Sequence, residues 1–575
     1  MLSYDFGNRG VDRQFCRRRI LAASAAALIL IARPAPAATT WYVSSAADDN
    51  GATTLRSIVA AAIGGDTINF TASLGGSTIT LTGGELAINK SLIINGLGPS
   101  QLAIVNLSGR VFHVQNGPIS VAISGFRLTG QVTGAKGADG TFFAHDGQKG
   151  EDVKGGCILN EVQCTLTVSN CLFTDCMAVG GNGGNGYTND NYGFLSNGGP
   201  GGEACGGAIC NNLGDALIYC CSFSSNSASG GMGGNGYYRG AGGFGGAGEG
   251  GAMCDVYGNQ DVLIVNCTFY TNAAAGGFGG NGGDAWINQI GPANGGTGGG
   301  GGNANGGAIF IGQGCPDATC TGLVHDTIDQ NVVLPGWGKP GGAGINGGMQ
   351  GGFGANGTAN GGGLYFQNAG HLPIQDTIIA GDFVIFRFTT GIFIYNGPDV
   401  SGNLDSFRYN LIGVADGSGG WVAGFDFLGS TVVPIDPLLG PYQNNGGETL
   451  TMAPLACSPV IDKGGATILN YDQIYQHRPV GITTPPYFGV VGSDIGAYEL
   501  QAYPASAPVP LTIAQINNGV VISWPSSSCF VLQQTGDLGK PNWVNSMYPV
   551  NVSGALKQVT ISPAPGNLFF RLWHP

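Results

Sequence analysis

Two aspartates in the middle of the chain are the first candidates for chemistry. Asp326 and Asp376 each lie inside a short apolar stretch, Val-His-Asp-Thr-Ile at 324–328 and Ile-Gln-Asp-Thr-Ile at 374–378. Hydrolysis of a glycosidic bond needs two carboxyl groups roughly 5–10 Å apart. If the two stretches stack, Asp326 and Asp376 are close enough for this reaction, with Asp329 and His325 beside them as further catalytic candidates.

Aromatic residues in the glycine-rich part of the chain are candidates for binding rather than catalysis. Such rings present flat apolar faces on which sugars can stack. They could equally hold the glycine-rich segments against the rest of the protein, and this second role is the favoured interpretation. The candidates are Tyr187, Tyr192, Phe194, Tyr237, Tyr238 and Trp286.

Both groups of candidates belong to a repeat, which is the strongest feature of the sequence. Successive copies begin 44 to 56 residues apart, and each continues, after a polar turn, into a second apolar stretch. Short β-branched stretches that recur in this way predict strands stacked in a parallel β-solenoid. The copies begin at Gly155-Gly156-Cys157-Ile158, Gly206-Gly207-Ala208-Ile209, Gly250-Gly251-Ala252-Met253, Gly306-Gly307-Ala308-Ile309 and Gly362-Gly363-Leu364-Tyr365.

Stacking makes columns of equivalent residues, about 4.8 Å apart along the coil. One column is apolar and faces inward, and it consists of Phe173, Phe223, Phe269, Ile328 and Ile378. The next contains Cys171, Cys221 and Cys267 and continues into Asp326 and Asp376. A polar column contains Asn170 and Asn266, with His325 and Gln375 as its continuation. Because Asp326 and Asp376 continue a cysteine column, a structural role is favoured over catalysis.

Glycine tracts separate the repeats and show a local period of three residues. Examples are 180–186, 230–236 and 276–283, in which two glycines precede one other residue. Extended helices of the polyproline-II type have three residues per turn, and only glycine lets several of them pack closely. An ordered polyglycine layer is therefore one interpretation. Flexible insertions at one corner of each coil are the other, and they are favoured.

Composition and charge exclude several classes of function. The chain has 107 glycines among 575 residues, 10% charged residues and a net charge of −13. An acidic chain is unsuited to a nucleic-acid backbone. Arg17–Arg19, an apolar run over 20–32 and Ala35-Pro36-Ala37 predict a secretory signal peptide over residues 1–37. We expect a secreted or cell-surface protein with no transmembrane segment after its removal.

Two segments resemble parts of known secreted proteins. Residues 54–70 resemble the Cys-Ser-Leu-Arg-Glu-Ala region of secreted β-helix proteins, without its Cys and Glu, and predict a helix over 54–63 and a strand over 67–70 that close the first coil. Residues 457–499 resemble the choice-of-anchor Q segment of secreted bacterial proteins, through Ser458-Pro-Val-Ile-Asp462 and Asp494-Ile-Gly-Ala-Tyr-Glu499. The resemblance covers about 40–500 and implies a right-handed parallel β-helix, similar to polymorphic outer-membrane proteins, with no established chemistry. We expect Asp472, Arg478 and Asp494 to form a structural ion-pair cluster at the last coil.

The C-terminal part has a different composition. Residues 504–510 read as a linker after a β-helix over 38–503, and residues 511–575 contain five apolar stretches. These predict a small β-sandwich, which resembles the C-terminal domain of many secreted verrucomicrobial-type proteins, a sorting or attachment module. The best disulfide candidates among the 15 cysteines are Cys315–Cys320 and then Cys171–Cys176, and no metal or cofactor site is expected.

Three functions remain open from the sequence. The first, and favoured, is a non-enzymatic surface or secreted protein that binds a polysaccharide or a cell-envelope component. The second is a polysaccharide lyase or glycoside hydrolase acting on the coil face, although a lyase needs an Arg or Lys base and the repeats contain almost none. The third is a structural element whose glycine tracts self-associate.

Overall fold

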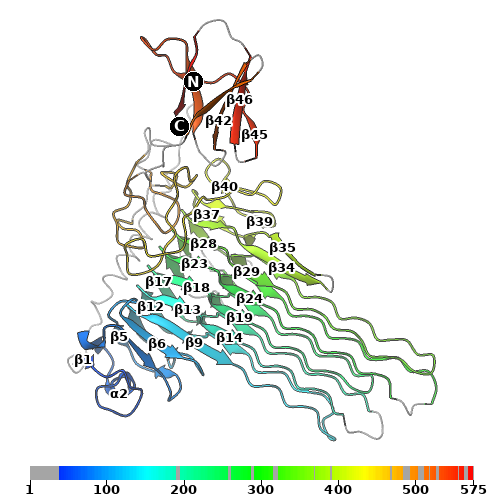
Figure 1. The fold of residues 1–575 in the computed structure, drawn as a ribbon. Coiled ribbons are helices and arrows are strands. Elements are labelled where there is room, and N and C mark those ends of the chain that lie inside the picture. Colours follow the sequence, from blue (N-terminus) through cyan, green and yellow to red (C-terminus); the bar gives the residue numbers. More distant parts are fainter. Residues whose placement is uncertain are drawn as a thin grey trace, which may run out of the picture.

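The structure is a computed structural model of an all-β protein that is built mainly as a parallel β-helix (Figure 1). The signal-peptide prediction at 1–37, Tyr192 and the Cys315–Cys320 pair all lie outside the described residues. The structure describes residues 38–188, 194–256, 261–286, 290–314, 322–367, 370–388, 391–465, 469–482, 492–502, 510–516, 519–525, 530–554, 556–562 and 567–573.

The first coil is closed by a short helix, as the sequence predicts. Helix α2 (Leu55–Ala61) begins after Thr54, whose side chain accepts a hydrogen bond from the backbone N–H of Ser57. Leu55, Ile58 and Val59 are buried in the main core. Because an open solenoid end exposes apolar core, this helix stabilises the N-terminal end. A single 3₁₀ turn, η1 (Ala72–Leu74), follows in the same region.

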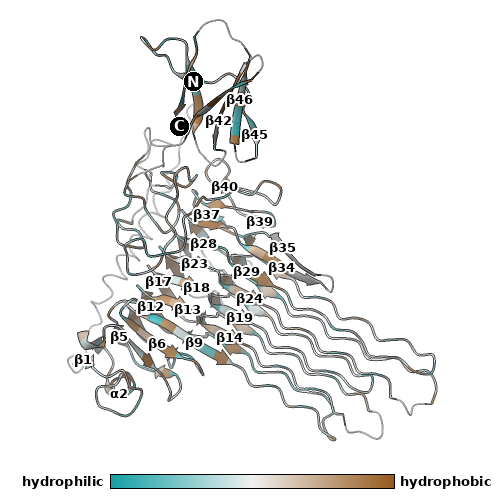
Figure 2. Ribbon diagram, viewed as in Figure 1, coloured by the Kyte–Doolittle hydropathy of each residue, from teal (hydrophilic) through white to brown (hydrophobic). Residues whose placement is uncertain are grey.

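Three long sheets form the walls of the coil, and nearly all of their strands are parallel. Apolar residues are concentrated in these strands (Figure 2). The first sheet consists of β1 (Thr40–Val43), β2 (Thr67–Phe70), β5 (Leu92–Asn95), β8 (Ile119–Ser124), β12 (Cys164–Ser169), β17 (Asp215–Tyr219), β22 (Val262–Val265), β27 (Gly322–Val324), β32 (Pro373–Gln375) and β37 (Asp405–Ser406). The second consists of β4 (Leu86–Ile88), β7 (Phe112–Val114), β11 (Ile158–Asn160), β16 (Ile209–Asn211), β21 (Met253–Asp255), β26 (Ile309–Ile311), β31 (Leu364–Phe366), β36 (Val400–Asn403) and β39 (Ser418–Gly419).

The third sheet branches at β9 (Arg127–Thr133), which pairs with strands of both branches. One branch contains β3 (Ser77–Thr80), β6 (Leu102–Asn106), β13 (Leu172–Thr174), β18 (Ser222–Ser224), β23 (Thr268–Tyr270), β28 (Thr327–Asp329), β33 (Ile378–Ala380), β38 (Leu411–Ile412) and β40 (Phe427–Leu428). The other contains β14 (Met177–Val179), β19 (Ser227–Ser229), β24 (Ala273–Ala275), β29 (Val332–Leu334), β34 (Phe383–Phe388) and β35 (Gly391–Asn396). A narrow sheet beside them contains β10 (Val153–Lys154), β15 (Ala204–Cys205), β20 (Gly248–Glu249), β25 (Ala304–Asn305) and β30 (Ala359–Asn360).

The inward apolar column is confirmed, except at its last member. The rings of Phe173 and Phe223 stack at 4.7 Å, and those of Phe223 and Phe269 at 4.6 Å. Ile328 follows Phe269 in register, but the next residue is Ile379 rather than Ile378. The fifth repeat is also shifted at its start, because Leu364 and not Tyr365 pairs with Ile309. Because this copy has three consecutive glycines, 361–363, where two are expected, the sequence allows two alignments and does not show the register.

The same shift separates Asp326 from Asp376. Gln375 pairs with Val324, so Asp376 stacks on His325, while Asp326 stacks on Thr377 and its backbone N–H donates to the Thr377 hydroxyl at 3.3 Å. His325 and Asp376 have φ values of 55° and 49°, in the left-handed region. Asn170, Cys220 and Asn266 share this column with φ of 50–53°. The column is therefore a corner of the coil, and Asp376 replaces the predicted Gln375 in it.

At the corners of the coil, backbone N–H groups donate hydrogen bonds to side-chain oxygens of the next coil. The backbone N–H of Cys267 donates to Asp326 Oδ1 at 2.8 Å. At the next corner, a ladder runs through Asn226, Asn272 and Asn331, each accepting the N–H of the equivalent residue one coil earlier at 2.9–3.1 Å. Since a buried unpaired N–H costs about 1–3 kcal/mol, these polar columns stabilise the coil.

The glycine tracts form an ordered layer rather than the flexible insertions that the sequence favoured. In each coil an outgoing segment leaves the β-helix and a returning segment comes back (Figure 1). Each triplet bonds in two directions: Gly183 N–H donates to Met232 O of the next coil at 2.7 Å, and Gly184 N–H donates to Gln148 O of the previous returning segment at 2.8 Å. The third residue carries the side chain, and Asn185 Oδ1 accepts Asn235 N–H at 2.9 Å.

In the first and the last coil of this layer, a larger residue stands at a position where the inner coils have glycine packed against a neighbouring coil. A Cβ on Gly199 or Gly243 would lie 2.0 Å from a carbonyl oxygen of the preceding coil. The first coil has no predecessor, and there the equivalent residue is Gln148. A Cβ on Gly298 would lie 1.7 Å from Lys339 O of the next coil, whereas the equivalent residue in the last coil is Phe353. The side chains of Gln148 and Phe353 therefore prevent a further coil from packing on either end of the layer.

A long irregular segment, described over 436–465, 469–482 and 492–502, covers one face of the coil; we call it the covering segment. Gln473 Nε2 donates to Ser222 Oγ at 2.9 Å, and the hydroxyl of Thr268 donates to Gln473 Oε1 at 2.6 Å. Arg478 is buried, pairs with Glu499 at 2.9 Å and donates to Asn266 Oδ1 at 3.1 Å. The predicted ion pair thus involves Glu499 instead of Asp472 or Asp494, and it lies on the coil face instead of the last coil.

The remaining features include two disulfides between described cysteines and a C-terminal two-sheet unit. Cys176 pairs with Cys157, so the predicted Cys171–Cys176 bond is wrong and Cys171 is a buried free thiol. Cys205 pairs with Cys254 in adjacent coils. The C-terminal sheets contain two strands more than the five predicted, and comprise β41 (Thr512–Ile516), β42 (Gly519–Pro525), β43 (Val531–Thr535), β44 (Val544–Asn545), β45 (Asn551–Ser553), β46 (Leu556–Ile561) and β47 (Phe569–Trp573).

Candidate functional site

Three of the four catalytic candidates are structural in their contacts. His325, Asp326 and Asp376 are 0% exposed. Asp376 Oδ1 accepts the N–H of Gly465 from the covering segment at 2.7 Å, and Asp376 Oδ2 lies 3.4 Å from His325 Nε2. Burial raises the pKa of Asp376 to about 7 and lowers the pKa of His325 well below its usual value. A substrate would reach these groups only after the covering segment had moved.

Asp329 is the one catalytic candidate that lines a hollow between the coil and the covering segment. The hollow has a volume of about 190 Å³, and Asp436, Tyr270 and Tyr442 also line it. The two tyrosine rings stack at 4.9 Å. Burial raises the pKa of Asp329 to about 7, and the negative charge of Asp436 adds to this effect. Asp329 therefore keeps its proton close to neutral pH, where it can donate a hydrogen bond.

Aromatic side chains gather at the far end of the glycine layer. We define the distal rim as residues 141–146 and 194–197, which lie where the first two outgoing segments turn back. Phe143 is 94% exposed, and Phe194 and Leu195 are about half exposed. The rings of Phe194 and His145 stack at 5.0 Å with planes 16° apart. Large apolar side chains exposed together mark an interaction site more often than isolated ones do.

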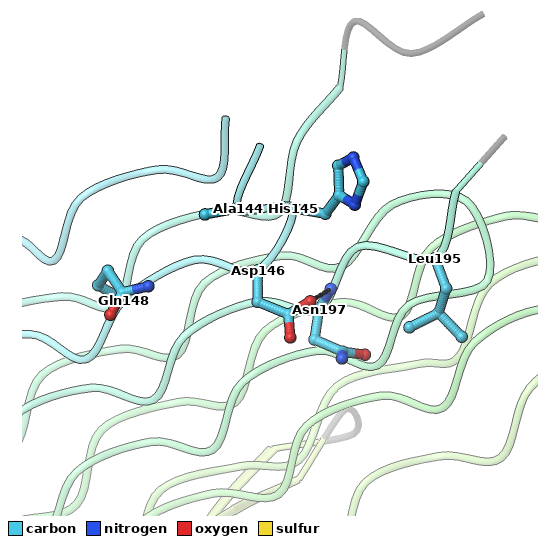
Figure 3. A pocket seen from close by; sticks show the side chains of 6 residues that line it. All are labelled: Ala144, His145, Asp146, Gln148, Leu195 and Asn197. Carbon is cyan, nitrogen blue, oxygen red and sulfur yellow. Dashed lines mark hydrogen bonds between the residues drawn. The ribbon is translucent and has the colours of Figure 1, made fainter. Parts of the chain in front are cut away.

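An open hollow of about 340 Å³ lies in this rim, lined by Ala144, His145, Asp146, Gln148, Leu195 and Asn197 (Figure 3). Asp146 Oδ1 accepts the backbone N–H of Asn197 at 2.7 Å and so joins the two loops. Figure 3 shows the side chains of Asp146 and Asn197 close together, with His145 and Leu195 on the same stretch of the rim. The hollow thus offers polar groups next to an apolar wall.

The predicted aromatic residues divide between the rim and its supports. Tyr187 packs edge-on against Phe142, with ring centroids 6.4 Å apart. Tyr238 donates its hydroxyl to Thr188 O at 2.6 Å, and the backbone N–H of Tyr237 donates to Ser196 O at 2.8 Å. These contacts join adjacent glycine-rich loops to one another, and not the loops to the coil. Trp286 is half-buried in a later loop.

Sequence analysis missed Phe142, Phe143, His145 and Leu195. The glycine-rich inserts were predicted over 131–360, which includes the first coil, but the pattern is weaker there because Ala135, Ala138, Gln148 and Glu151 replace glycine. The signal was present in the period of three through Gly134, Gly137 and Gly140.

Comparisons with known proteins add no assignment. No protein-family model matches the chain, and no curated protein matches it either. Among the described residues, no helix has the length and apolar character needed to cross a membrane. The class of the protein, a parallel β-helix with a glycine layer, therefore rests on the sheets and hydrogen bonds described above.

Proposed function

We propose that this is an exported β-helix protein that binds a polysaccharide or another cell-envelope component through the distal rim, without catalysing a reaction. It acts at the cell surface or outside the cell. The observation that carries the proposal is the exposure of Phe143, Phe194 and Leu195 in the distal rim, which also contains an open hollow lined by Leu195. Rings held this way offer stacking faces for sugars.

The glycine layer supports the proposal because it holds the rim in place. Its segments are hydrogen-bonded to neighbours on several sides, for example through Gly199 N–H to Gly184 O at 2.8 Å. Binding to a preorganised surface costs less conformational entropy than binding to a loop that must first be ordered. The substituted end coils, with Gln148 and Phe353, weigh against the alternative of self-association through the layer edges.

The test is a pull-down of the exported protein with a panel of soluble and insoluble polysaccharides and isolated envelope material. The double variant Phe143→Ser/Phe194→Ser should bind about 5- to 150-fold more weakly, since two stacking rings contribute roughly 0.5–1.5 kcal/mol each, or about 1–3 kcal/mol together. Phe353→Ser is the matched control, because Phe353 is 68% exposed but lies on the last coil instead of the rim. Equal binding by all three proteins would contradict the rim assignment.

Product release is measured in the same tubes to separate binding from catalysis. We expect no reducing sugar and no unsaturated product from any polysaccharide that binds. Product that appears with the native protein and disappears in Asp329→Asn would replace this proposal with a hydrolase acting in the hollow between the coil and the covering segment.

A further inference from the structure

Three cysteine sulfurs meet in a second, small core outside the main coil. Cys205 comes from β15, Cys210 from β16 and Cys254 from β21. All three are buried, and their sulfurs lie within 4.8 Å of one another, with Cys205 Sγ and Cys210 Sγ 3.5 Å apart. Cys205 and Cys254 are joined as a disulfide, whereas Cys210 is a free thiol. Cys210 is thus a third buried sulfur beside the disulfide.

The surroundings of the three sulfurs are apolar, with charged residues of both signs beyond them, Lys154 and Arg110 against Asp255 and Glu161. Leu159 and Phe310 complete the buried cluster, and both lie in the same outward-facing column of the second sheet as Cys210 and Cys254. Lys154 is the register partner of Cys205 in the preceding coil. Burial raises the pKa of the Cys210 thiol, and the charge of Lys154 opposes this increase.

From this arrangement we propose that Cys205, Cys210 and Cys254, in the chain with the Cys205–Cys254 bond reduced, form a site for one soft monovalent metal ion of the Cu(I) type. Thiolate ligands favour Cu(I), and Zn²⁺ usually takes four ligands. Among the described residues, the cluster offers three. A metal bonded to three sulfurs at about 2.3 Å in their plane needs sulfurs roughly 4 Å apart. Cys210 Sγ already lies 3.5 Å from Cys205 Sγ, whereas the sulfurs of Cys205 and Cys254, which are bonded in the structure, must separate after reduction.

The chemistry consists of two separate steps. A dithiol reductant gives two electrons and two protons to the Cys205–Cys254 bond, yielding two thiols and an oxidised reductant. Cu(I) then replaces protons on the sulfurs and releases them to solvent, with no change in the oxidation state of copper. Metal binding and the disulfide exclude each other, because both use the sulfurs of Cys205 and Cys254.

The experiment compares copper retention by reduced protein under anaerobic conditions. Folded wild-type protein is treated with a phosphine reductant, freed of it, loaded with acetonitrile-stabilised Cu(I) and challenged with a bathocuproine chelator. Wild type should retain one copper more per chain than Cys210→Ser. Cys267→Ser, which changes a buried thiol in another column, should retain as much as wild type.

Two further readouts make the outcome decisive. Bound Cu(I) should protect Cys205 and Cys254 from forming a disulfide on exposure to air, as judged by alkylation and mass spectrometry. Circular dichroism should show that reduced wild type and Cys210→Ser keep their strands, with Cys210→Ala as the second variant. Equal copper retention by wild type and both Cys210 variants, equal loss in Cys267→Ser, or loss of fold on reduction would each overturn the proposal.

Discussion

A single methyl group added inside the glycine layer should destabilise it strongly. Gly243 is buried in the third returning segment, and its Cβ would lie 2.0 Å from Gly199 O, where ordinary contact begins at 3.4 Å. The two segments must therefore separate by more than 1 Å in Gly243→Ala. That movement breaks the hydrogen bonds that join the two segments, from Gly198 N–H to Ala241 O and from Gly201 N–H to Phe244 O, which measure 2.9 and 2.8 Å.

The expected cost follows from those two bonds. Leaving a buried backbone group without its partner costs about 1–3 kcal/mol, so Gly243→Ala should lose about 2–4 kcal/mol after partial relaxation. Gly352→Ala is the matched control in the last returning segment, because the nearest atom to its Cβ is Thr297 Cγ2 at 4.0 Å. There alanine should be neutral or stabilise by up to about 1 kcal/mol, through a smaller entropy of the unfolded chain.

Hydrogen exchange measured by mass spectrometry is the appropriate assay, because a repeat protein can open locally without unfolding as a whole. Gly243→Ala should accelerate exchange in peptides that cover residues 198–203, 230–237 and 276–284, while peptides from the β-helix walls keep their protection. Gly352→Ala should leave the same peptides unchanged. Unchanged exchange in Gly243→Ala, or equal acceleration in both variants, would refute the close-packed layer.

Three further perturbations test the coil and its covering segment. Because burial raises the pKa of Asp376 to about 7, its contribution to stability is complete below about pH 4 and is lost as the pH rises through 7; Asp376→Asn should therefore lose less stability than wild type between pH 4 and pH 8 in denaturant unfolding, while the share of Asp329, whose pKa is also raised to about 7, remains. Arg478→Met should leave the Glu499 carboxylate buried without its ion pair and cost about 3–5 kcal/mol, detected as faster proteolysis of the covering segment, and Arg478→Met/Glu499→Gln should recover part of the loss. Replacing Cys157 and Cys176 by serine should lower stability by about 3 kcal/mol, as expected for opening a short covalent loop, and a thermal midpoint that stays unchanged would contradict a bond between these residues.

The repeat was predictable because it follows from simple periodicity. Inward residues such as Phe173, Phe223 and Phe269 recur at one position of each copy, and equal spacing within the copies fixes their register. The prediction failed by one residue after Ile328, because the similar strings around Asp326 and Asp376 suggested an alignment that the corner geometry does not follow. The left-handed backbone conformation at this corner is adopted by His325 and Asp376 as well as by asparagine. The residue type alone therefore does not show which position forms the corner.

Contacts between distant segments could not be derived from the sequence. Arg478 and Asn266 are far apart along the chain, and no local pattern indicates that the covering segment brings them together. The order of the glycine layer also depends on neighbouring coils, since each segment gains its hydrogen bonds only from the segments around it. Of the distal rim, the sequence pointed to Phe194 but not to Phe143, because Phe143 becomes part of a shared surface only once the first two loops are adjacent.

The two ends of the glycine layer determine how such a protein can grow during evolution. Duplication of an inner coil inserts a unit whose upper and lower surfaces already match those of its neighbours, so the new gene product needs no compensating change. Duplication of an end coil would bury Gln148 or Phe353 against a carbonyl group, and selection would remove it unless glycine arose there as well. Changes in the number of coils should therefore occur in the interior of the gene, while the sequences that encode the first and last coils keep their bulky residues.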